Sequence, residues 1–215
     1  MSSKKATGSD GIPIIVIQRI WSSIGFIFTK LVNGMLRYGK HPDIWKMAKT
    51  IVLGKPGKKS YSVAGSFRPI ALLPIFSRIF ESAMTHRLVY IAESKNFFPS
   101  VQYGFRKFHS TTDGLLHLRD FIESNVKKKW IVSLISLDLT GAYDNVNHRK
   151  LMEKIRALDI PSYIISWIDD FIRNRSTYFS YKNLSSPTYY LQKGVPQGSP
   201  IEHIIHKKLC VCFCR

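Results

Sequence analysis

Cysteine is almost absent from this chain of 215 residues, and its three copies all fall within the last six positions. This placement excludes a disulfide framework and favours an intracellular setting, with nucleus and cytoplasm both left open. Cys210 and Cys212 could be combined with His203 and His206 as a zinc site. The Cys-x-Cys spacing is tight for tetrahedral ligands, however, and no structured context surrounds it, so we do not expect zinc there.

Acidic residues are also scarce, with 14 Asp and Glu against 32 Lys and Arg, a net charge of +18 and a pI of about 10.0. Such a balance is typical of a protein whose partner is a polyanion. The alternative is a basic protein that merely repels other copies of itself. The length and the 45% hydrophobic content are sufficient for one domain with an ordinary core.

Long uninterrupted apolar runs are missing, as are a signal peptide, repeats and low-complexity segments. The most apolar stretch, residues 12–36, is interrupted by Gln18, Arg19, Lys30 and Asn33. These interruptions argue against a transmembrane segment, and we expect no membrane partner. Its large apolar residues predict one face of an amphipathic helix instead, formed by Ile20, Ile24, Ile27, Leu31 and Met35.

The remaining periodicity predicts helices and strands without regular βαβ alternation, which is typical of an α+β fold. Helices are predicted over residues 13–39, 74–94, 111–127 and 151–158 and from residue 161 onward. Strands are predicted over residues 49–53, 131–137, 176–182 and 188–192, the last two as a hairpin. The 111–127 helix is expected to be capped by Thr111 or Thr112 and to turn inward Leu115, Leu118, Ile122 and Val126.

The strand Ile131–Leu137 is almost continuously apolar, which predicts burial on both faces. Asp138 follows it directly, and Asp144 comes six residues later. A buried strand rarely carries a carboxylate unless a metal or partner compensates the charge. At the strand end, Asp138 can stay partly hydrated and still be held rigidly, as a metal ligand must be. A lone Asp at this position would more simply cap the next turn.

Two segments then resemble motifs A and B of reverse transcriptases, namely Ser136–Asp144 (Ser-Leu-Asp-Leu-Thr-Gly-Ala-Tyr-Asp) and Gly194–Pro200 (Gly-Val-Pro-Gln-Gly-Ser-Pro). The resemblance is strongest to the polymerases of non-LTR (LINE-type) retrotransposons. Three upstream segments agree with that family in the same order: Lys5–Pro13, Trp45–Leu73 and Gln102–Asp113. Each motif alone is weak, but five in the right order and spacing make a strong signal.

The resemblance implies a right-hand polymerase fold of the α+β class, with fingers and part of a palm and without a thumb. Residues 1–35 would form an N-terminal helical flank, residues 36–200 the incomplete fingers and palm, and residues 201–215 a divergent tail. After motif B the family continues to a Tyr/Phe-x-Asp-Asp hairpin, which this sequence does not contain. Asp169 and Asp170 precede motif B within a helical pattern and cannot replace it by position. A truncation, a frameshift or a mispredicted exon is therefore expected.

In the family, the motif A strand pairs with that hairpin, so residues 131–137 are expected to lose one neighbour and part of their cover. Each fully buried side chain of this type contributes ~1.5–3 kcal/mol. A typical domain has a net stability of only ~5–15 kcal/mol. The loss predicts a marginally stable, aggregation-prone chain with an unpaired apolar strand.

The activity implied by the resemblance is RNA-directed DNA polymerisation, with an RNA template, a DNA primer and dNTPs as partners. Two Mg²⁺ ions are expected in the intact family, and here Asp138 would be the first carboxylate ligand, with the Leu139 carbonyl as a backbone ligand. Because the second acidic motif is missing, we expect this chain to be inactive by itself. The alternatives are a nucleic-acid-binding remnant without chemistry and a translated pseudogene.

Further roles follow from the resemblance by position. Tyr143 would be the bulky gate beneath the incoming sugar, although by itself it would be read as a packed aromatic. Gly141 and Ala142 would lie near the triphosphate with small side chains and backbone N–H groups. Lys55 and Arg68 would clamp triphosphate oxygens, with ordinary surface charge as the alternative.

The two remaining assignments concern the turn and the loop beside it. Gln197 would pack near the new base pair, and Gly198 would be a structural residue next to it. Asp144 is interpreted as structural, bonding to nearby backbone or capping the following helix.

Overall fold

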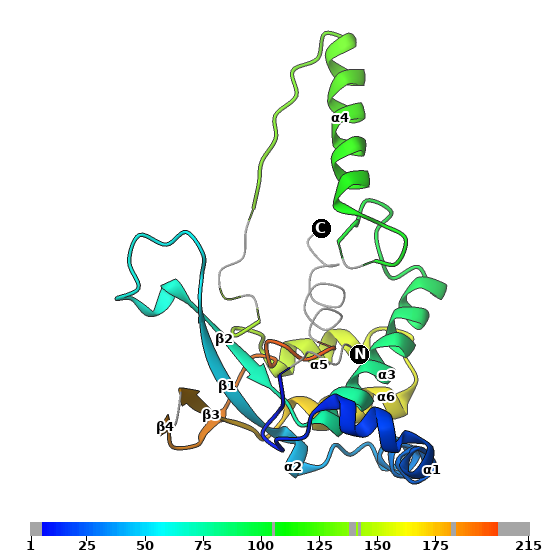
Figure 1. Ribbon diagram of the computed structural model, residues 1–215. Coiled ribbons are helices and arrows are strands. Elements are labelled where there is room, and N and C mark those ends of the chain that lie inside the picture. Colours follow the sequence, from blue (N-terminus) through cyan, green and yellow to red (C-terminus); the bar gives the residue numbers. More distant parts are fainter. Residues whose placement is uncertain (1–5, 105, 138–140, 142, 182–183, 202–215) are drawn as a thin grey trace.

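The computed structural model describes all residues except 1–5, 105, 138–140, 142, 182–183 and 202–215. It contains both helices and a sheet, as an α+β fold requires (Figure 1). The helices are α1 (Ile14–Tyr38), α2 (Asp43–Lys46), α3 (Ile75–Ser94), α4 (Thr111–Lys127), α5 (His148–Arg156) and α6 (Ser162–Ile172), with a short 3₁₀ turn at Ala64–Ser66. The strands are β1 (Met47–Gly54), β2 (Phe67–Leu72), β3 (Arg175–Tyr181), β4 (Leu184–Ser185) and β5 (Tyr189–Leu191).

The five strands form one sheet in which β1 lies between β2 and β3. β1 pairs antiparallel with β2 and parallel with β3, while β4 and β5 pair antiparallel with β3. The predicted strand at 49–53 and the predicted hairpin are thus confirmed. β2 was not predicted as a strand, and Pro69 explains why, since proline within an apolar run argues against a central strand. β2 is an edge strand, where proline is tolerated.

The main core lies among the helices. Its centre consists of apolar side chains from α3, α5 and α6 with no exposed surface, namely Phe80, Ile155, Ile164, Trp167, Ile168, Phe171 and Ile172. Phe28, Met35 and Leu36 of α1 belong to the same cluster. The predicted helices at 74–94, 151–158 and from 161 onward are confirmed, and each contributes the apolar face that its periodicity indicated.

Helix α1 begins after Pro13 and ends at Gly39, as predicted, but its buried face was predicted wrongly. Of the expected face only Met35 is buried, whereas Ile27 is 67% exposed and Phe28 packs into the core. The apolar residues of α1 surround most of the helix, so periodicity alone did not identify the packed side. Among the described residues, α1 is also the one helix long and apolar enough to cross a membrane. This is weak evidence for a membrane span, because core helices of soluble proteins pass the same test of length and composition.

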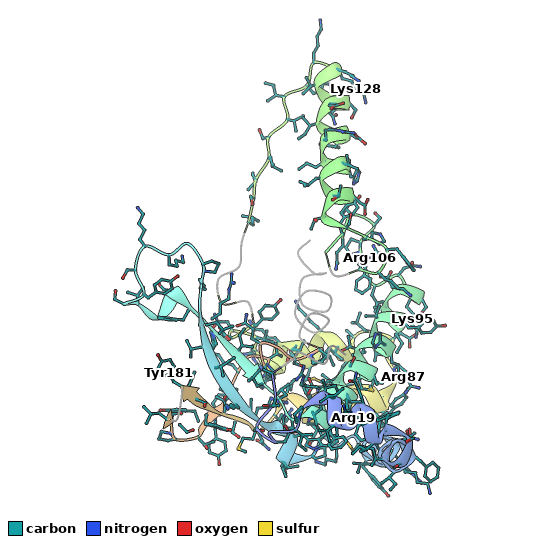
Figure 2. The ribbon with its side chains drawn as sticks, viewed as in Figure 1. Arg19, Arg87, Lys95, Arg106, Lys128 and Tyr181 are labelled. Atoms are coloured by element: carbon teal, nitrogen blue, oxygen red, sulfur yellow. The ribbon has the colours of Figure 1, made fainter. Side chains whose placement is uncertain are left out.

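Helix α4 extends away from the rest of the molecule, and residues 128–137 return beside it as an irregular segment (Figure 1). Helix α4 and this returning segment are here called the arm. Arg106 holds the base of this arm to α3 through an ion pair of 2.8 Å with Glu93, and Lys128 lies at its far tip (Figure 2). The helix was predicted correctly, but its cap is Ser110, which forms a reciprocal capping box with Asp113.

The predicted burial of the arm is wrong. No residue of α4 is buried, and residues 131–137 form no strand in the described part of the chain. Ile131 is 97% exposed and Leu137 is 89% exposed. An apolar β-branched run indicates that a segment suits a buried strand, but burial also requires neighbouring strands, and none of the described strands pairs with it. Residues 131–137 are therefore more exposed than the sequence indicated.

This difference in burial gives a matched pair of substitutions. Ile155→Val is expected to lower the free energy of unfolding by about 0.5–1.5 kcal/mol because it leaves a small cavity in the core. Ile135→Val should change it by less than about 0.5 kcal/mol, since the Ile135 side chain is largely exposed. Urea unfolding followed by circular dichroism measures both. Equal losses in the two variants would show that residues 131–137 are buried in solution.

Candidate functional site

The segment Gly194–Pro200, here called the Pro-Gln-Gly turn, packs against the loop that follows Asp138. The Gly194 N–H donates to the Val146 carbonyl at 2.8 Å, and the Val195 N–H donates to the Tyr143 carbonyl at 3.0 Å. The bond to Tyr143 joins motif A to motif B through backbone groups, and the bond to Val146 holds the residues just after motif A. The sequence separates these bonded groups by about 50 residues, and the fold places them in contact.

Glycine is required at two positions of this turn. Gly194 has φ +86°, and a Cβ there would lie 2.9 Å from the Asp144 carbonyl oxygen. Gly198 has φ +112°, and a Cβ there would lie 2.9 Å from the Ala71 carbonyl oxygen. The Ala71 N–H also donates to the Gln197 carbonyl at 2.8 Å. The turn therefore connects the motif A loop to the edge strand β2. Its backbone lies so close to both that a Cβ at either glycine would clash with a carbonyl oxygen.

Beneath the turn lies Glu81, a fully buried carboxylate on α3. It accepts hydrogen bonds from the Ser77 hydroxyl at 2.5 Å and from the Ser199 hydroxyl of the turn. The Ser199 oxygen in turn accepts from the Ile201 N–H at 3.3 Å. Burial raises the pKa of Glu81 above its ordinary value, against the opposing effects of the Arg175 charge and the two hydroxyls. One buried acid thus anchors the turn to the helical core.

Arg175, the first residue of β3, is buried as well. Its Nη1 donates to the Phe171 carbonyl at 3.1 Å, and its guanidinium lies 4.6 Å from the centre of the Phe171 ring. Burial lowers its pKa to about 10, with the charge of Glu81 working in the opposite direction. Its Nη2 has no hydrogen-bond partner among the described residues.

A cavity of about 420 Å³ lies between the sheet and the Pro-Gln-Gly turn. Thr50 and Thr177 line its sheet side and share a hydrogen bond of 2.6 Å. Asp144, Lys193 and Gln197 line its other side. The cavity therefore combines apolar walls with a carboxylate, an ammonium and an amide, a composition suited to a small polar ligand.

The structure brings together four of the predicted site residues, and these are Tyr143, Asp144, Gln197 and Gly198. Gly141 lies in the same loop as Tyr143, where its carbonyl accepts from the Asn145 N–H at 3.0 Å. Three others, Asp138, Leu139 and Ala142, lie outside the described residues. The ring of Tyr143 is partly buried against the main core, which accounts for its packing and leaves its role as a sugar gate a prediction.

The two predicted cations occupy different surroundings. Arg68 is exposed on β2, three residues before Ala71. At the strand rise of about 3.3 Å per residue, it lies about 10 Å along the strand from the point where the turn docks. Lys55 lies in the loop after β1, where its ammonium donates to the Gly65 carbonyl at 2.8 Å. Arg68 is therefore available to a ligand near the turn, while Lys55 stabilises its own loop.

The predicted structural role of Asp144 needs one correction, because it does not cap the next helix. Asn147 is the N-cap of α5 and accepts a hydrogen bond from the Lys150 N–H at 3.1 Å. The side chain of Asp144 is exposed at the rim of the cavity instead.

The Asp169-Asp170 pair, which was not expected to act as the missing motif, has structural partners. Asp169 pairs with Arg173 at 2.7 Å, and Asp170 pairs with Lys40 and the buried Lys46, each at 3.0 Å. Both carboxylates are thus neutralised by cations from α6 and its neighbours.

Sequence reasoning missed Glu81, Ser199 and His148. The His148 Nε2 lies 2.7 Å from the Gly194 carbonyl oxygen and so holds the start of the turn. A signal for Glu81 was present, because it occupies the same helical stripe as the buried Met84 and Leu88. A carboxylate on an apolar stripe indicates a buried partner. For His148 we find no comparable signal.

The fit of a magnesium site can be examined only for the described residues, which do not include Asp138 and Leu139. Among the described residues, no three His, Cys, Asp or Glu side chains gather closely enough to hold a metal ion. Asp144 is the one carboxylate of the described part of the motif A loop. A single exposed carboxylate does not fit a two-metal centre, so we derive no chemical step through a metal from these residues.

Comparison with known proteins identifies the class. Residues 54–206 match the family described as "Reverse transcriptase (RNA-dependent DNA polymerase)", and the chain therefore belongs to the reverse transcriptase family. Enzymes of this family generally use divalent metal ions.

Individual relatives are retrotransposon proteins. The "Probable RNA-directed DNA polymerase from transposon BS" of Drosophila melanogaster is 28% identical over 94% of this chain and 22% of its own length. The RNA-directed DNA polymerase from mobile element jockey, from the same species, is 30% identical over 91% of this chain and 21% of its own length. The chain spans about a fifth of these relatives. The predicted resemblance to non-LTR retrotransposon polymerases is confirmed.

Proposed function

We propose that this chain supplies the nucleotide-facing part of a retrotransposon RNA-directed DNA polymerase. The observation that carries the proposal is the contact of the motif A loop with the Pro-Gln-Gly turn, which is docked in turn on β2. In this arrangement the sheet β1–β3 with its helices corresponds to fingers. The motif A loop and the turn correspond to part of a palm. RNA template, DNA primer and dNTP are the proposed partners.

The proposed roles rest on the family motifs, and the role of Arg68 is also supported by its exposure on β2. Asp138 and the Leu139 carbonyl would hold Mg²⁺. Arg68, exposed on the strand that receives the turn, would contact triphosphate oxygens through charge-assisted hydrogen bonds. Tyr143 would limit the space beneath the sugar, and Gln197 would lie near the new base pair.

We further propose that these 215 residues bind nucleic acid but do not polymerise by themselves. The sequence contains no Asp-Asp pair after Gly194–Pro200, so Asp138 is the one acidic anchor that the family motifs supply. The net charge of +18 supports binding to a polyanion without chemistry, which is the second candidate function.

Two measurements on the purified chain test this proposal. Binding to an RNA–DNA hybrid should weaken steeply with salt, because each neutralised phosphate releases counterions. Primer extension on poly-A with oligo-dT and Mg²⁺ should give no product above background. An absence of salt-dependent hybrid binding would refute the proposed partners. Steady dNTP incorporation that is lost in Asp138→Ala would refute the proposed inactivity.

A further inference from the structure

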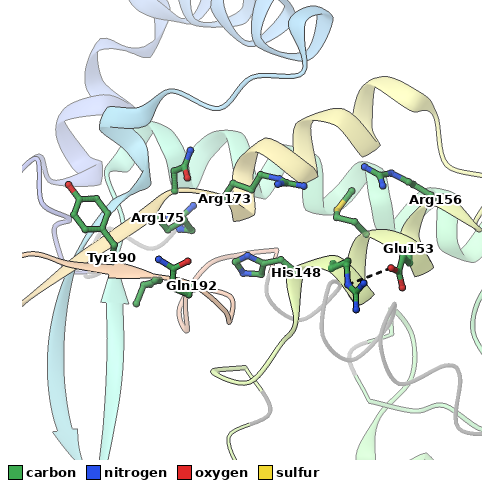
Figure 3. A pocket seen from close by; sticks show the side chains of 11 residues that line it. His148, Glu153, Arg156, Arg173, Arg175, Tyr190 and Gln192 are labelled. Atoms are coloured by element: carbon green, nitrogen blue, oxygen red, sulfur yellow. Dashed lines mark ion pairs between the residues drawn. The ribbon is translucent and has the colours of Figure 1, made fainter.

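A second cavity, of about 670 Å³, lies on the other side of His148 from the Pro-Gln-Gly turn. Its walls come from α5, from the segment joining α6 to β3, and from β5 (Figure 3). None of these wall residues belongs to the motif segments identified in the sequence. One of them, His148, contacts a motif residue, Gly194. The cavity shares Arg175, Tyr190, Leu191 and Gln192 with the cavity of about 420 Å³ at the Pro-Gln-Gly turn, so it adjoins the nucleotide site proposed above and extends from it along α5.

The charge of this cavity is strongly positive. Four arginines line it, namely Arg149, Arg156, Arg173 and Arg175, together with a single carboxylate, Glu153. Arg156 and Arg173 point toward one another (Figure 3) and share one nearby carboxylate, Asp169, at 3.4 and 2.7 Å. Glu153 pairs with Arg149 at 3.8 Å. The carboxylates are outnumbered, so positive charge remains for an anion.

The position of the buried Arg175 strengthens this reading. It lines the floor of the cavity, and its Nη2 has no hydrogen-bond partner among the described residues. An unsatisfied buried donor is costly, and such groups usually have an explanation in a ligand or water. Above it, the side chains of Arg149, Arg156 and Arg173 are 81%, 58% and 59% exposed, so they can reach a ligand from solvent.

The shape and composition favour a strand rather than a lone phosphate. The exposed arginines form two groups along the cavity, since Arg156 and Arg173 meet at Asp169 while Arg149 pairs with Glu153. Tyr190, at the same cavity, is 74% exposed and offers a free aromatic face. A basic groove with an exposed aromatic ring is the arrangement by which proteins bind single-stranded nucleic acid without sequence preference.

We propose that this cavity binds the sugar–phosphate backbone of a single nucleic-acid strand, with one base stacked on Tyr190. The proposal deepens the proposed function, on which it rests, by adding a second contact for template or primer. His148 connects this cavity to the Pro-Gln-Gly turn, because it lines the cavity and its ring hydrogen-bonds the Gly194 carbonyl.

The test measures binding of the whole chain to a fluorescent single-stranded RNA by anisotropy over a range of salt concentrations. The double variant Arg149→Gln/Arg156→Gln should bind more weakly. The slope of its log affinity against log salt should be shallower by about 1.4, that is about 0.7 for each lost phosphate contact. Both arginines are exposed and pair with surface carboxylates, so folding should be preserved.

The matched control is Arg19→Gln/Arg119→Gln, which removes the same charge from exposed positions on α1 and α4. This control should keep the wild-type slope to within about 0.3. Equal effects in the two double variants would overturn the proposal, because they would reflect net charge alone.

A second variant separates a strand from a free phosphate or nucleotide. Tyr190→Leu keeps an apolar side chain on β5 but removes the ring, and RNA affinity should fall roughly fivefold or more. Unchanged RNA affinity in Tyr190→Leu would overturn the stacked strand. Competition by inorganic phosphate or a dNTP at matched ionic strength, as strong as by unlabelled RNA, would overturn it too. If the wild type binds no RNA at all, the proposed function fails as well, whereas wild-type binding with unaffected variants refutes this site alone.

Discussion

His41 alone is expected to contribute a loss of stability of roughly 1.4 kcal/mol for each pH unit below about pH 6.5. His41 is 2% exposed, its Nε2 lies 3.1 Å from the Ser77 hydroxyl, and its Nδ1 accepts from the Trp167 indole at 3.4 Å. Both ring nitrogens are thus engaged in a neutral imidazole. Protonation of Nδ1 would break the bond to Trp167 and place a charge in the core.

The direction of the effect follows from linkage. Burial lowers the pKa of His41 to about 3, assisted by the charges of Arg175 and Lys46 and opposed by Asp170. The unfolded chain, with a His pKa near 6.5, therefore binds more protons than the folded chain between these two values. The stabilising contribution of neutral His41 is complete above pH 6.5 and is lost progressively as the pH falls toward 3.

Urea unfolding between about pH 7 and about pH 4 measures this slope in the wild type, in His41→Gln and in His86→Gln. His41→Gln should show a slope smaller by roughly 1.4 kcal/mol per pH unit. The exposed His86 is the control and should leave the slope unchanged. Glu81 acts in the opposite direction, since its raised pKa gives stability that is present below 4.5 and is lost as pH rises through its folded value. The difference between the variants isolates His41, and parallel curves for all three chains would contradict the prediction.

Local periodicity predicted the elements of this fold well where a segment has one apolar side. The helices carrying Phe80, Ile155 and Trp167 fall where the sequence indicated them, because their apolar residues recur at helical spacing and meet a common core. The hairpin of β3 and β5 was also predicted, from alternation and a polar connection. In each of these elements, the spacing of apolar residues within the segment itself indicates which side is buried.

Prediction failed where burial depends on another part of the chain. Ile131–Leu137 has the composition of a buried strand, yet composition does not show whether neighbouring strands are present. For α1, the ring of apolar residues fits several packed faces equally well. The strand β2 was not predicted because Pro69 argues against a central strand. Proline is tolerated in an edge strand, and the position of β2 at the edge is known only from the strand order.

The candidate site shows the same division. Gly194 and Gly198 belong to a recognisable motif, so their turn was found, although the sequence alone could not show which backbones approach them. Arg175 and His148 belong to no motif, and their importance comes from tertiary contacts. The motif sequence thus located the turn but not the residues that hold it in place.

Glu81→Ala is expected to lower the free energy of unfolding by about 3–5 kcal/mol, a large fraction of the stability of a typical domain. The substitution leaves the buried Arg175 without its nearby carboxylate, and it leaves the Ser77 and Ser199 hydroxyls without their acceptor. Glu153→Ala is the control, because the Glu153 side chain is 60% exposed in its pair with Arg149 and should cost only about 0–1 kcal/mol.

Because Glu81→Ala could prevent folding, Glu81→Gln provides the structural readout. If Glu81 holds the Pro-Gln-Gly turn, this variant should speed hydrogen exchange at the Ala71 and Ile201 amides, which bond to the turn. Amides within the β1–β3 pairing should keep their protection. A double-mutant cycle with Ser199→Ala should give a coupling energy of about 0.5–3 kcal/mol. Additive losses with uniform exchange would mean that Glu81 supports the core in general and that the turn is positioned by its two glycines and His148 without it.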